Sequence, residues 1–253
     1  MKLFSRKYGS GQPLIILHGL FGQSDNWNTL AKQFAENGLE VYTVDLRNHG
    51  LSPWSEEWNY KVMGEDINEF IEEKDLQDAV VIGHSLGGKV AMRFALDHPG
   101  KLAKLIVVDI APKQYPTGPN AVIEGLNSVD LSKINSRKEA EEQLVKYIPE
   151  APVRQFLLKN LYWKEEGRLA WRFNLDVITD NFEEVNREIS GGPVNVPAVF
   201  IRGTLTGYVQ DEDLPAIKKL FPNAGLVTID GAGHWIHADK PKEFYEAVMK
   251  ILS

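Results

Sequence analysis

The sequence contains no cysteine. This absence excludes disulfide bonds, a catalytic thiolate and cysteine-ligated zinc. No segment reaches the roughly 18 consecutive apolar residues of a membrane-spanning helix, and the opening segment MKLFSRKYGSGQP lacks the apolar stretch of a secretory signal. We therefore expect a soluble, cytoplasmic protein that has no membrane span.

Basic residues are also fewer than acidic ones. The chain has 28 lysines and arginines against 35 aspartates and glutamates, which gives a formal net charge of −7. This acidic balance argues against nucleic acid as a partner. A length of 253 residues with 43% hydrophobic and 25% charged residues is typical of one large globular α/β domain, with room for an insertion.

Short apolar segments alternate with helical patterns at both ends of the chain, which predicts a mainly parallel sheet with helices on both faces. The alternating segment at residues 2–8 is followed by a GSGQ turn signal, and we expect it to pair with the strand after that turn. The other predicted strands lie at residues 13–19, 39–45, 79–84, 104–112, 196–203 and 225–230, and the predicted helices at residues 26–38, 66–76, 86–99 and 240–252.

A serine stands at a sharp corner in the segment VVIGHSLGGKV, residues 80–90. Gly83, Ser85 and Gly87 match the pattern G-x-S-x-G, in which a turn between a strand and a helix lifts the serine clear of the sheet. The following helix directs its N-terminal dipole at the same place, where negative charge would develop. We predict that Ser85 is a nucleophile rather than the cap of a glycine-rich helix.

A serine nucleophile needs a general base, and the base needs a third group to orient it. Of the six histidines, His234 lies in GAGHWIH, between the last predicted strand and the last predicted helix. The chain order serine, acid, histidine places the base there. His237 is the competing candidate, and we interpret it as a structural histidine.

Four motifs occur in the order LHGLFG, DLRNHGLS, GHSLGG and GAGHWIH. Together they resemble the α/β-hydrolase superfamily over nearly the whole chain. Within that superfamily, DLRNHGLS and VVDIAP are similar to the small serine esterases of bacteria and mitochondria. The resemblance implies the α/β-hydrolase fold, a mostly parallel central sheet flanked by helices. We interpret Asp45, Arg47 and His49 of the second motif as residues that tie their loop by hydrogen bonds.

The acid of the expected triad has three candidates. In most of the superfamily it follows the strand that corresponds to residues 196–203, but Thr206 occupies that place here. Asp211 and Asp213 lie nearby in an acidic helix start, which the helix dipole explains without catalysis. Asp109 ends a buried strand next to the nucleophile strand, and the resembling esterases place their acid at this strand end. We predict Asp109, with Asp211 and Asp213 as alternatives.

Acyl transfer also requires two N–H donors for the oxyanion. One is expected to be the backbone of Leu86, directly after the nucleophile. By resemblance, the other is the backbone of Leu20, which follows the His-Gly pair, with Phe21 as an alternative. The candidates for substrate contact are Phe21, Trp163 and Trp235.

Between residues 112 and 193 the strand pattern disappears, and the segment has the pattern of several helices. We predict a helical lid over the carboxyl ends of the strands, inserted after the third strand–helix unit past the nucleophile region. The hydrolase core would then comprise residues 1–111 and 194–253, with residues 112–193 as the lid.

These residues predict a serine hydrolase that cleaves carboxylic esters, or thioesters, of small to medium acyl groups through an acyl-enzyme intermediate. The alternatives are a C–C bond hydrolase or lyase on the same triad, and a ligand-binding member of the fold without turnover. We expect no cofactor, and no metal because no histidine and carboxylate cluster has the spacing of a metal site. The partner would be a small ester or thioester, and the chain a monomer or a dimer.

Overall fold

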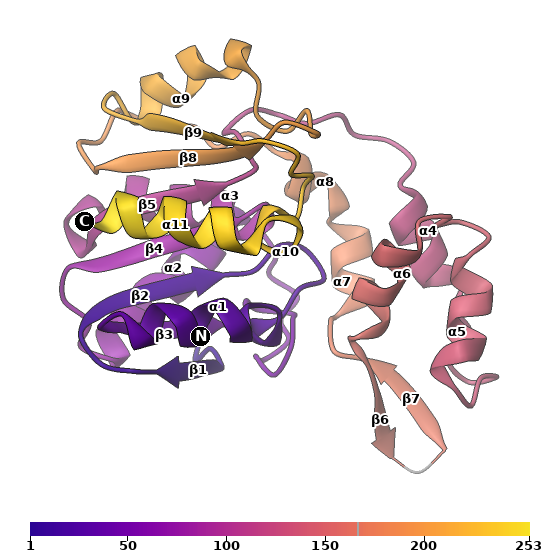
Figure 1. Ribbon diagram of the computed structural model, residues 1–253. Coiled ribbons are helices and arrows are strands. Elements are labelled where there is room, and N and C mark those ends of the chain that lie inside the picture. The colour runs from indigo at the N-terminus through magenta and orange to yellow at the C-terminus, as the bar shows by residue number, and fades with distance from the viewer. Residues whose placement is uncertain (166) are drawn as a thin grey trace.

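The computed structural model describes residues 1–165 and 167–253. Its centre is a seven-stranded sheet in the order β1-β3-β2-β4-β5-β8-β9 (Figure 1). Only β1 runs antiparallel to its neighbour among these strands, which confirms the predicted, mostly parallel sheet. The strands are β1 Ser5–Tyr8, β2 Gln12–Leu17, β3 Leu39–Val44, β4 Ala79–His84, β5 Leu102–Val108, β8 Ala198–Gly203 and β9 Gly225–Ile229.

Helices cover both faces of this sheet. In Figure 1, α1 and α11 lie in front of the sheet, and α2 and α3 lie behind it. The helices of this layered core are α1 Asn28–Glu36, α2 Tyr60–Glu73, α3 Leu86–Asp97, α9 Leu214–Leu220, α10 Ile236–Asp239 and α11 Pro241–Leu252. Two clusters of buried side chains result, one on each face of the sheet.

The central strand β4 shows why both faces are apolar. All six of its residues are buried. Successive side chains of a strand point to opposite faces, so Val80 and Ile82 join the cluster with α1 and α11, and Val81 joins the cluster with α2 and α3. A strand buried on both sides therefore reads as a continuous apolar run in the sequence.

The expected pairing of the first two strands is wrong. β1 pairs with β3, with Ser5 opposite Val44, and β2 lies on the far side of β3. The four residues from Leu14 to Leu17 of β2 are all buried, whereas β1 is half-exposed. An apolar strand needs neighbours and helices around it, so β2 takes an interior place and the polar β1 becomes the edge.

The segment between β5 and β8 forms a lobe beside the carboxyl ends of the strands (Figure 1). It contains α4 Ala121–Ser128, α5 Arg137–Leu144, α6 Ala151–Leu158, β6 Leu161–Glu165, β7 Arg168–Trp171, α7 Leu175–Asp180 and α8 Phe182–Asn186. The lobe follows β5, the first strand after α3, and not a third strand–helix unit as we expected.

The prediction of helices at residues 152–163 and 168–178 is also wrong where they overlap residues 161–163 and 168–171. There β6 and β7 form an antiparallel pair in which Leu161 lies opposite Trp171. In β7 the buried Leu169 and Trp171 alternate with the exposed Arg168 and the half-buried Ala170. This two-residue alternation is the period of a strand, and it was read as part of a helical pattern.

The carboxyl ends of the strands bring distant residues together. His84 ends β4 opposite Val108 of β5, so the next residues, Ser85 and Asp109, leave the sheet side by side. In parallel α/β sheets this edge is where ligands bind. None of the helices formed by the described part of the chain is long and apolar enough to cross a membrane.

Candidate active site

Ser85 lies on a tight turn between β4 and α3, with φ 52° and ψ −117°. A positive φ is uncommon for a residue with a side chain, and such strain clusters at functional sites. The Ser85 N–H donates to the Val108 carbonyl at 3.0 Å, which holds the turn against β5. A Cβ on Gly83 would lie 2.2 Å from the Gly87 carbonyl oxygen, so the turn requires glycine there.

Asp109 and His234 are in direct contact. The Nδ1 atom of His234 lies 2.8 Å from Oδ2 of Asp109. Asp109 follows β5 and is fully buried, and His234 lies in the loop between β9 and α10. Because Nδ1 faces the carboxylate, Nε2 is the ring nitrogen of His234 that remains for proton transfer.

The Asp109 carboxylate has two further donors. Oδ2 also accepts a hydrogen bond from Thr206 Oγ1 at 2.9 Å, and Oδ1 accepts one from the Gly203 N–H at 3.3 Å. A buried carboxylate is costly unless its oxygens are hydrogen-bonded. Thr206, at the position where most of the superfamily has its acid, is therefore a hydrogen-bond donor to the predicted acid Asp109.

The two alternative aspartates are engaged elsewhere. Asp211 pairs with Arg202 Nη2 at 2.7 Å on the surface. Asp213 accepts hydrogen bonds from the Gln210 N–H and from Lys113 Nζ, both at 2.8 Å. The bond from the Gln210 N–H is a capping contact at a helix start, whereas the contacts with Arg202 and Lys113 are ion pairs with residues outside that helix.

Leu20 and Leu86 line the same cavity as Ser85, and their backbone N–H groups are the expected oxyanion donors. Within residues 1–165 and 167–253, neither N–H donates to a protein acceptor. Leu86 is the first residue of α3, where N–H groups have no partner inside the helix. The Phe21 N–H, the alternative donor, donates instead to His49 Nε2 at 3.1 Å.

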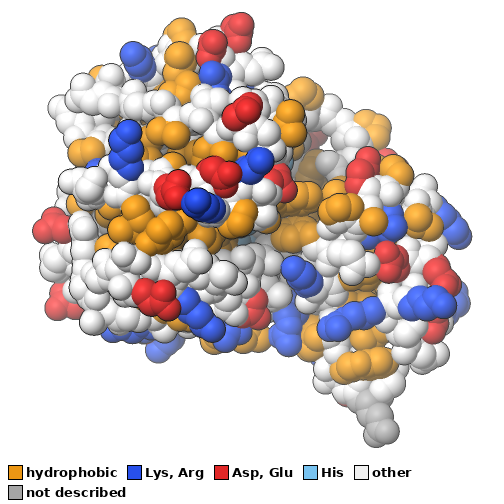
Figure 2. Space-filling model, viewed as in Figure 1, with side chains coloured by type: hydrophobic (Ala, Val, Ile, Leu, Met, Phe, Trp, Pro, Cys, Tyr) orange, Lys and Arg blue, Asp and Glu red, His pale blue; other side chains and the backbone are white. Residues whose placement is uncertain are grey.

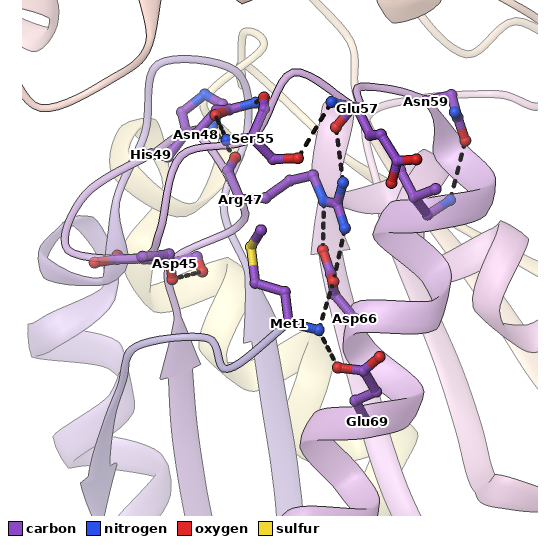
Figure 3. Close-up of polar contacts among 12 residues, drawn as sticks. Met1, Asp45, Arg47, Asn48, His49, Ser55, Glu57, Asn59, Asp66 and Glu69 are labelled. Carbon is purple, nitrogen blue, oxygen red and sulfur yellow. Dashed lines mark hydrogen bonds and ion pairs between the residues drawn. The ribbon is translucent and has the colours of Figure 1, made fainter.

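The loop after β3 holds the segment that contains Leu20 and Phe21. Asp45 Oδ1 accepts from the Ser24 N–H, and its Oδ2 accepts from the Leu51 N–H. Arg47 makes a two-pronged ion pair with the buried Asp66 (Figure 3). These contacts support the interpretation of DLRNHGLS as a structural motif.

Two buried histidines connect that loop to the segment after β2. His49 Nε2 accepts from Phe21, and His18 Nε2 accepts from the Leu46 N–H at 3.0 Å. Burial lowers the pKa of His49 to about 3 and that of His18 to about 4. Both rings are therefore neutral at neutral pH, as an accepting Nε2 requires.

Ser85 and His234 line a cavity of about 230 Å³ between the sheet and the lobe. Figure 2 shows a hollow at this junction with hydrophobic side chains in its depth. Its apolar lining comes from both parts of the chain and includes Leu20, Phe21, Trp27, Leu86, Ile110, Val122, Val153, Phe156, Leu157, Phe182, Val185 and Trp235.

Two of the three residues expected to contact substrate reach this cavity. Phe21 and Trp235 line it, and Phe156 of the lobe packs on Trp235 with ring centroids 5.4 Å apart. Trp163 does not. It lies on the β6–β7 pair, is 53% exposed, and is not among the described residues that surround the cavity. Within β6 only Leu161 is buried, and the strand becomes exposed from Trp163 to Glu165, so Trp163 lies outside the packed part of the lobe.

His237 is a buried histidine that also borders the cavity. Its ring stacks on Trp27 with centroids 4.0 Å apart, and burial lowers its pKa to about 3. Its Nδ1 has no hydrogen-bond partner within the described residues. His237 therefore lacks the carboxylate contact that His234 makes.

Sequence reasoning did not single out two neighbours of the site. The Tyr208 ring stacks on the His234 ring with centroids 4.0 Å apart. Lys89, four residues after Ser85 on α3, is fully buried and donates from Nζ to the carbonyls of Val185, Asn186 and Arg187. The available signal for Lys89 was a lysine within the apolar first two turns of α3, Leu86–Met92.

Comparison with known proteins identifies the family. Residues 12–128 match the family model of the alpha/beta hydrolase fold. The chain is 39% identical to an sn-1-specific diacylglycerol lipase ABHD11 of Danio rerio, over 96% of this chain and 79% of the relative. It is 33% identical to the esterase YbfF of Escherichia coli, over 96% of this chain and 94% of the relative.

A solved structure is also similar over the full length. It is a marine microorganism esterase that is 47% identical to this chain and superposes with a TM-score of 0.96 over 99% of both chains. Relatives at these identities and coverages show common descent as well as a common fold. The chain therefore belongs to the α/β-hydrolase fold family, and it is an enzyme of the esterase type.

Proposed function

We propose that this protein is a serine hydrolase that cleaves carboxylic esters of small to medium acyl groups through an acyl-enzyme intermediate. Ser85 attacks the acyl carbon, His234 accepts its proton, and Asp109 orients the imidazole and stabilises its charged form. The single observation that carries this proposal is the 2.8 Å contact between His234 Nδ1 and Asp109 Oδ2, beside a serine on a strained turn.

The attack on an ester carbonyl creates an oxyanion, which the backbone N–H groups of Leu20 and Leu86 would receive. His234 then returns the proton to the leaving alcohol, and the acyl group remains on Ser85. Water, activated by His234, releases the acid in the second half of the reaction. A thioester would follow the same steps, with a thiol as the leaving group.

The cavity supports an apolar acyl group of limited size. Its volume of about 230 Å³ lies below the roughly 300–1,000 Å³ of drug-sized ligand sites. Its lining is mainly aliphatic and aromatic, as a hydrocarbon chain requires. The lobe contributes Phe156, Leu157 and Phe182 to that lining, so we propose that it acts as the lid of the site.

The test is hydrolysis of the p-nitrophenyl esters of acetate, butyrate and octanoate. We expect wild-type turnover, and losses of about 10³-fold or more in kcat for Ser85→Ala and Asp109→Asn. Asp211→Asn is the matched control and keeps wild-type kcat. Mass spectrometry of the quenched reaction should find the acyl group on the peptide that contains Ser85.

The alternatives give different results in the same assay. A C–C hydrolase, a lyase or a binding protein would leave all three esters uncleaved. Turnover that survives Ser85→Ala would overturn the proposed nucleophile. The same assay on a butyryl thioester, run alongside the butyrate ester, measures the preference between ester and thioester.

A further inference from the structure

His84 lies immediately before Ser85, at the end of β4, and is buried. Its Nε2 atom is 2.8 Å from the carbonyl oxygen of His234. A carbonyl only accepts hydrogen bonds, so Nε2 of His84 must carry the proton and donate it. The residue before the proposed nucleophile is therefore hydrogen-bonded to the backbone of the proposed base, 150 positions later in the chain.

The other side of the His84 ring contacts the segment that supplies Leu20. A Cβ placed on Gly19 would lie 2.8 Å from His84 Nδ1 and 3.3 Å from the Cβ of Ser85. Gly19 thus packs directly against both residues, which explains the need for glycine before Leu20. The ring centroid of His84 is also 4.8 Å from that of His234 and 4.9 Å from that of His237.

Apart from the Tyr208 ring stacked on its own ring, His234 has few other restraints. It belongs to an irregular loop, in which the Gly231 N–H donates to Thr204 Oγ1 and the Gly233 N–H donates to Asp239 Oδ2. These bonds fix the residues before His234, and the Asp109 contact fixes its ring. Only the bond from His84 restrains the peptide group of His234 in the described part of the chain.

We propose that His84 is a positioning residue that holds three segments in register: the His234 loop, the Gly19–Leu20 segment and the Ser85 turn. This inference rests on the proposed function, because that function gives catalytic roles to residues of all three segments. A displacement of about 1 Å in a reacting group can cost on the order of 100-fold in rate. His84 touches no reacting atom, so its effect should fall on kcat rather than on substrate binding.

The charge state of His84 suits this position. Burial, and after it the nearby rings of His234 and His237, lowers the pKa of His84 well below its ordinary value. A neutral ring adds no charge beside His234, which becomes positively charged during acyl transfer. The hydrogen bond to the His234 carbonyl then persists across the pH range in which the enzyme would be assayed.

The experiment compares His84→Gln with His84→Leu. The side-chain amide of glutamine reaches about as far as Nε2 of histidine and can donate to the same carbonyl, whereas leucine fills the space without a donor. With p-nitrophenyl butyrate we expect kcat to fall about 10- to 100-fold in His84→Leu, with KM within about twofold of wild type. His84→Gln should keep kcat within about threefold. His98→Leu, at the C-terminal cap of α3, is the matched control and keeps wild-type kcat.

A readout that mere destabilisation would not move is the downfield proton resonance of the His234–Asp109 hydrogen bond. We expect it to weaken or shift in His84→Leu and to return in His84→Gln. If the leucine variant does not fold, His84→Asn replaces it, because asparagine is polar but too short to reach the His234 carbonyl.

Two results would overturn the inference. Wild-type kcat in His84→Leu would show that the position of His234 does not depend on His84. Equal losses in the glutamine and leucine variants would assign the effect to ring packing and not to the hydrogen bond. Failure of the proposed function looks different, since turnover would then survive Ser85→Ala in the wild-type background.

Discussion

Thr206 Oγ1 and His234 Nδ1 both contact the same oxygen, Oδ2 of Asp109, at 2.9 and 2.8 Å. The Tyr208 N–H in turn donates to Thr206 Oγ1 at 3.0 Å, which leaves the threonine proton for the carboxylate. Thr206 therefore acts on the carboxylate of Asp109 as a fixed donor.

Removing the Thr206 hydroxyl should weaken the proposed triad without abolishing it. Thr206→Val loses a hydrogen bond to a charged group, which is typically worth about 1.5–3 kcal/mol, and we expect kcat on p-nitrophenyl butyrate to fall roughly tenfold. Thr206→Ser keeps the donor and should stay close to wild type. Steady-state kinetics of the two variants at pH 7.5 checks this.

Thr206→Asp should be slower than Thr206→Val. It places a second carboxylate against Asp109, and two like charges at hydrogen-bond distance raise the pKa of one of them. The shared proton competes with His234 for the carboxylate. A gain in kcat in Thr206→Asp would instead show that the acid works from position 206.

Lys89 should make stability depend on pH. Burial lowers the pKa of its ammonium group from 10.5 to about 7. Between these two pH values the unfolded chain holds this proton and the folded chain does not, so the free energy of unfolding rises as the pH increases from about 7. The slope is at most about 1.4 kcal/mol per pH unit.

Urea unfolding at pH 7 and pH 9 measures this contribution. We expect wild type to gain roughly 2 kcal/mol relative to Lys89→Met over this interval. Lys101→Met removes an exposed lysine next to the same helix and should follow wild type. Parallel pH profiles of wild type and Lys89→Met would mean that Lys89 stays charged throughout.

Gly87→Ala should destabilise the fold. A Cβ at this position would lie 2.6 Å from the carbonyl oxygens of both Leu17 and His18, at the end of β2. Backbone at the centre of a sheet cannot yield easily, so we expect a loss of at least about 2 kcal/mol in the free energy of unfolding. Gly100→Ala, whose Cβ would meet no described atom within 4 Å, should change it by less than about 0.5 kcal/mol.

Removing one partner of the Arg47–Asp66 ion pair should lower the free energy of unfolding far more than replacing both partners with apolar residues. Arg47 Nε and Nη2 lie 2.6 and 2.9 Å from the Asp66 oxygens, and both side chains are buried. Arg47→Met leaves a buried carboxylate without its main partner, and we expect a loss of about 3–5 kcal/mol in unfolding free energy. The double variant Arg47→Met/Asp66→Leu should recover part of that loss. Additive losses from the two single variants would contradict the coupling.

The places of Ser85 and His234 in the fold could be predicted from local sequence. Gly83 and Gly87 flank the serine because the turn has no space for a Cβ, and a continuous apolar strand precedes it. His234 follows the last strand in a loop with two glycines. These are short-range steric and periodic signals, so they are visible without the partner segments.

From the sequence alone, the acid of the proposed triad could be narrowed only to three aspartates. Asp109 and His234 are 125 residues apart, and they meet because β5, β8 and β9 are neighbours in the sheet. Strand order depends on which edges and faces are buried, which no local pattern encodes. For the same reason the positions of β1 at the edge and of Trp163 away from the cavity were predicted wrongly.

The amino-acid sequence by itself determined the class of fold, the serine turn and the histidine loop, because periodicity and glycine placement act within a few residues. The tertiary structure decided which carboxylate holds His234, that Thr206 supports it, and that His84 connects the two loops. Each of these contacts joins segments that only the packed sheet brings within hydrogen-bond distance, and their geometry follows from the burial of both faces of β4 and β5.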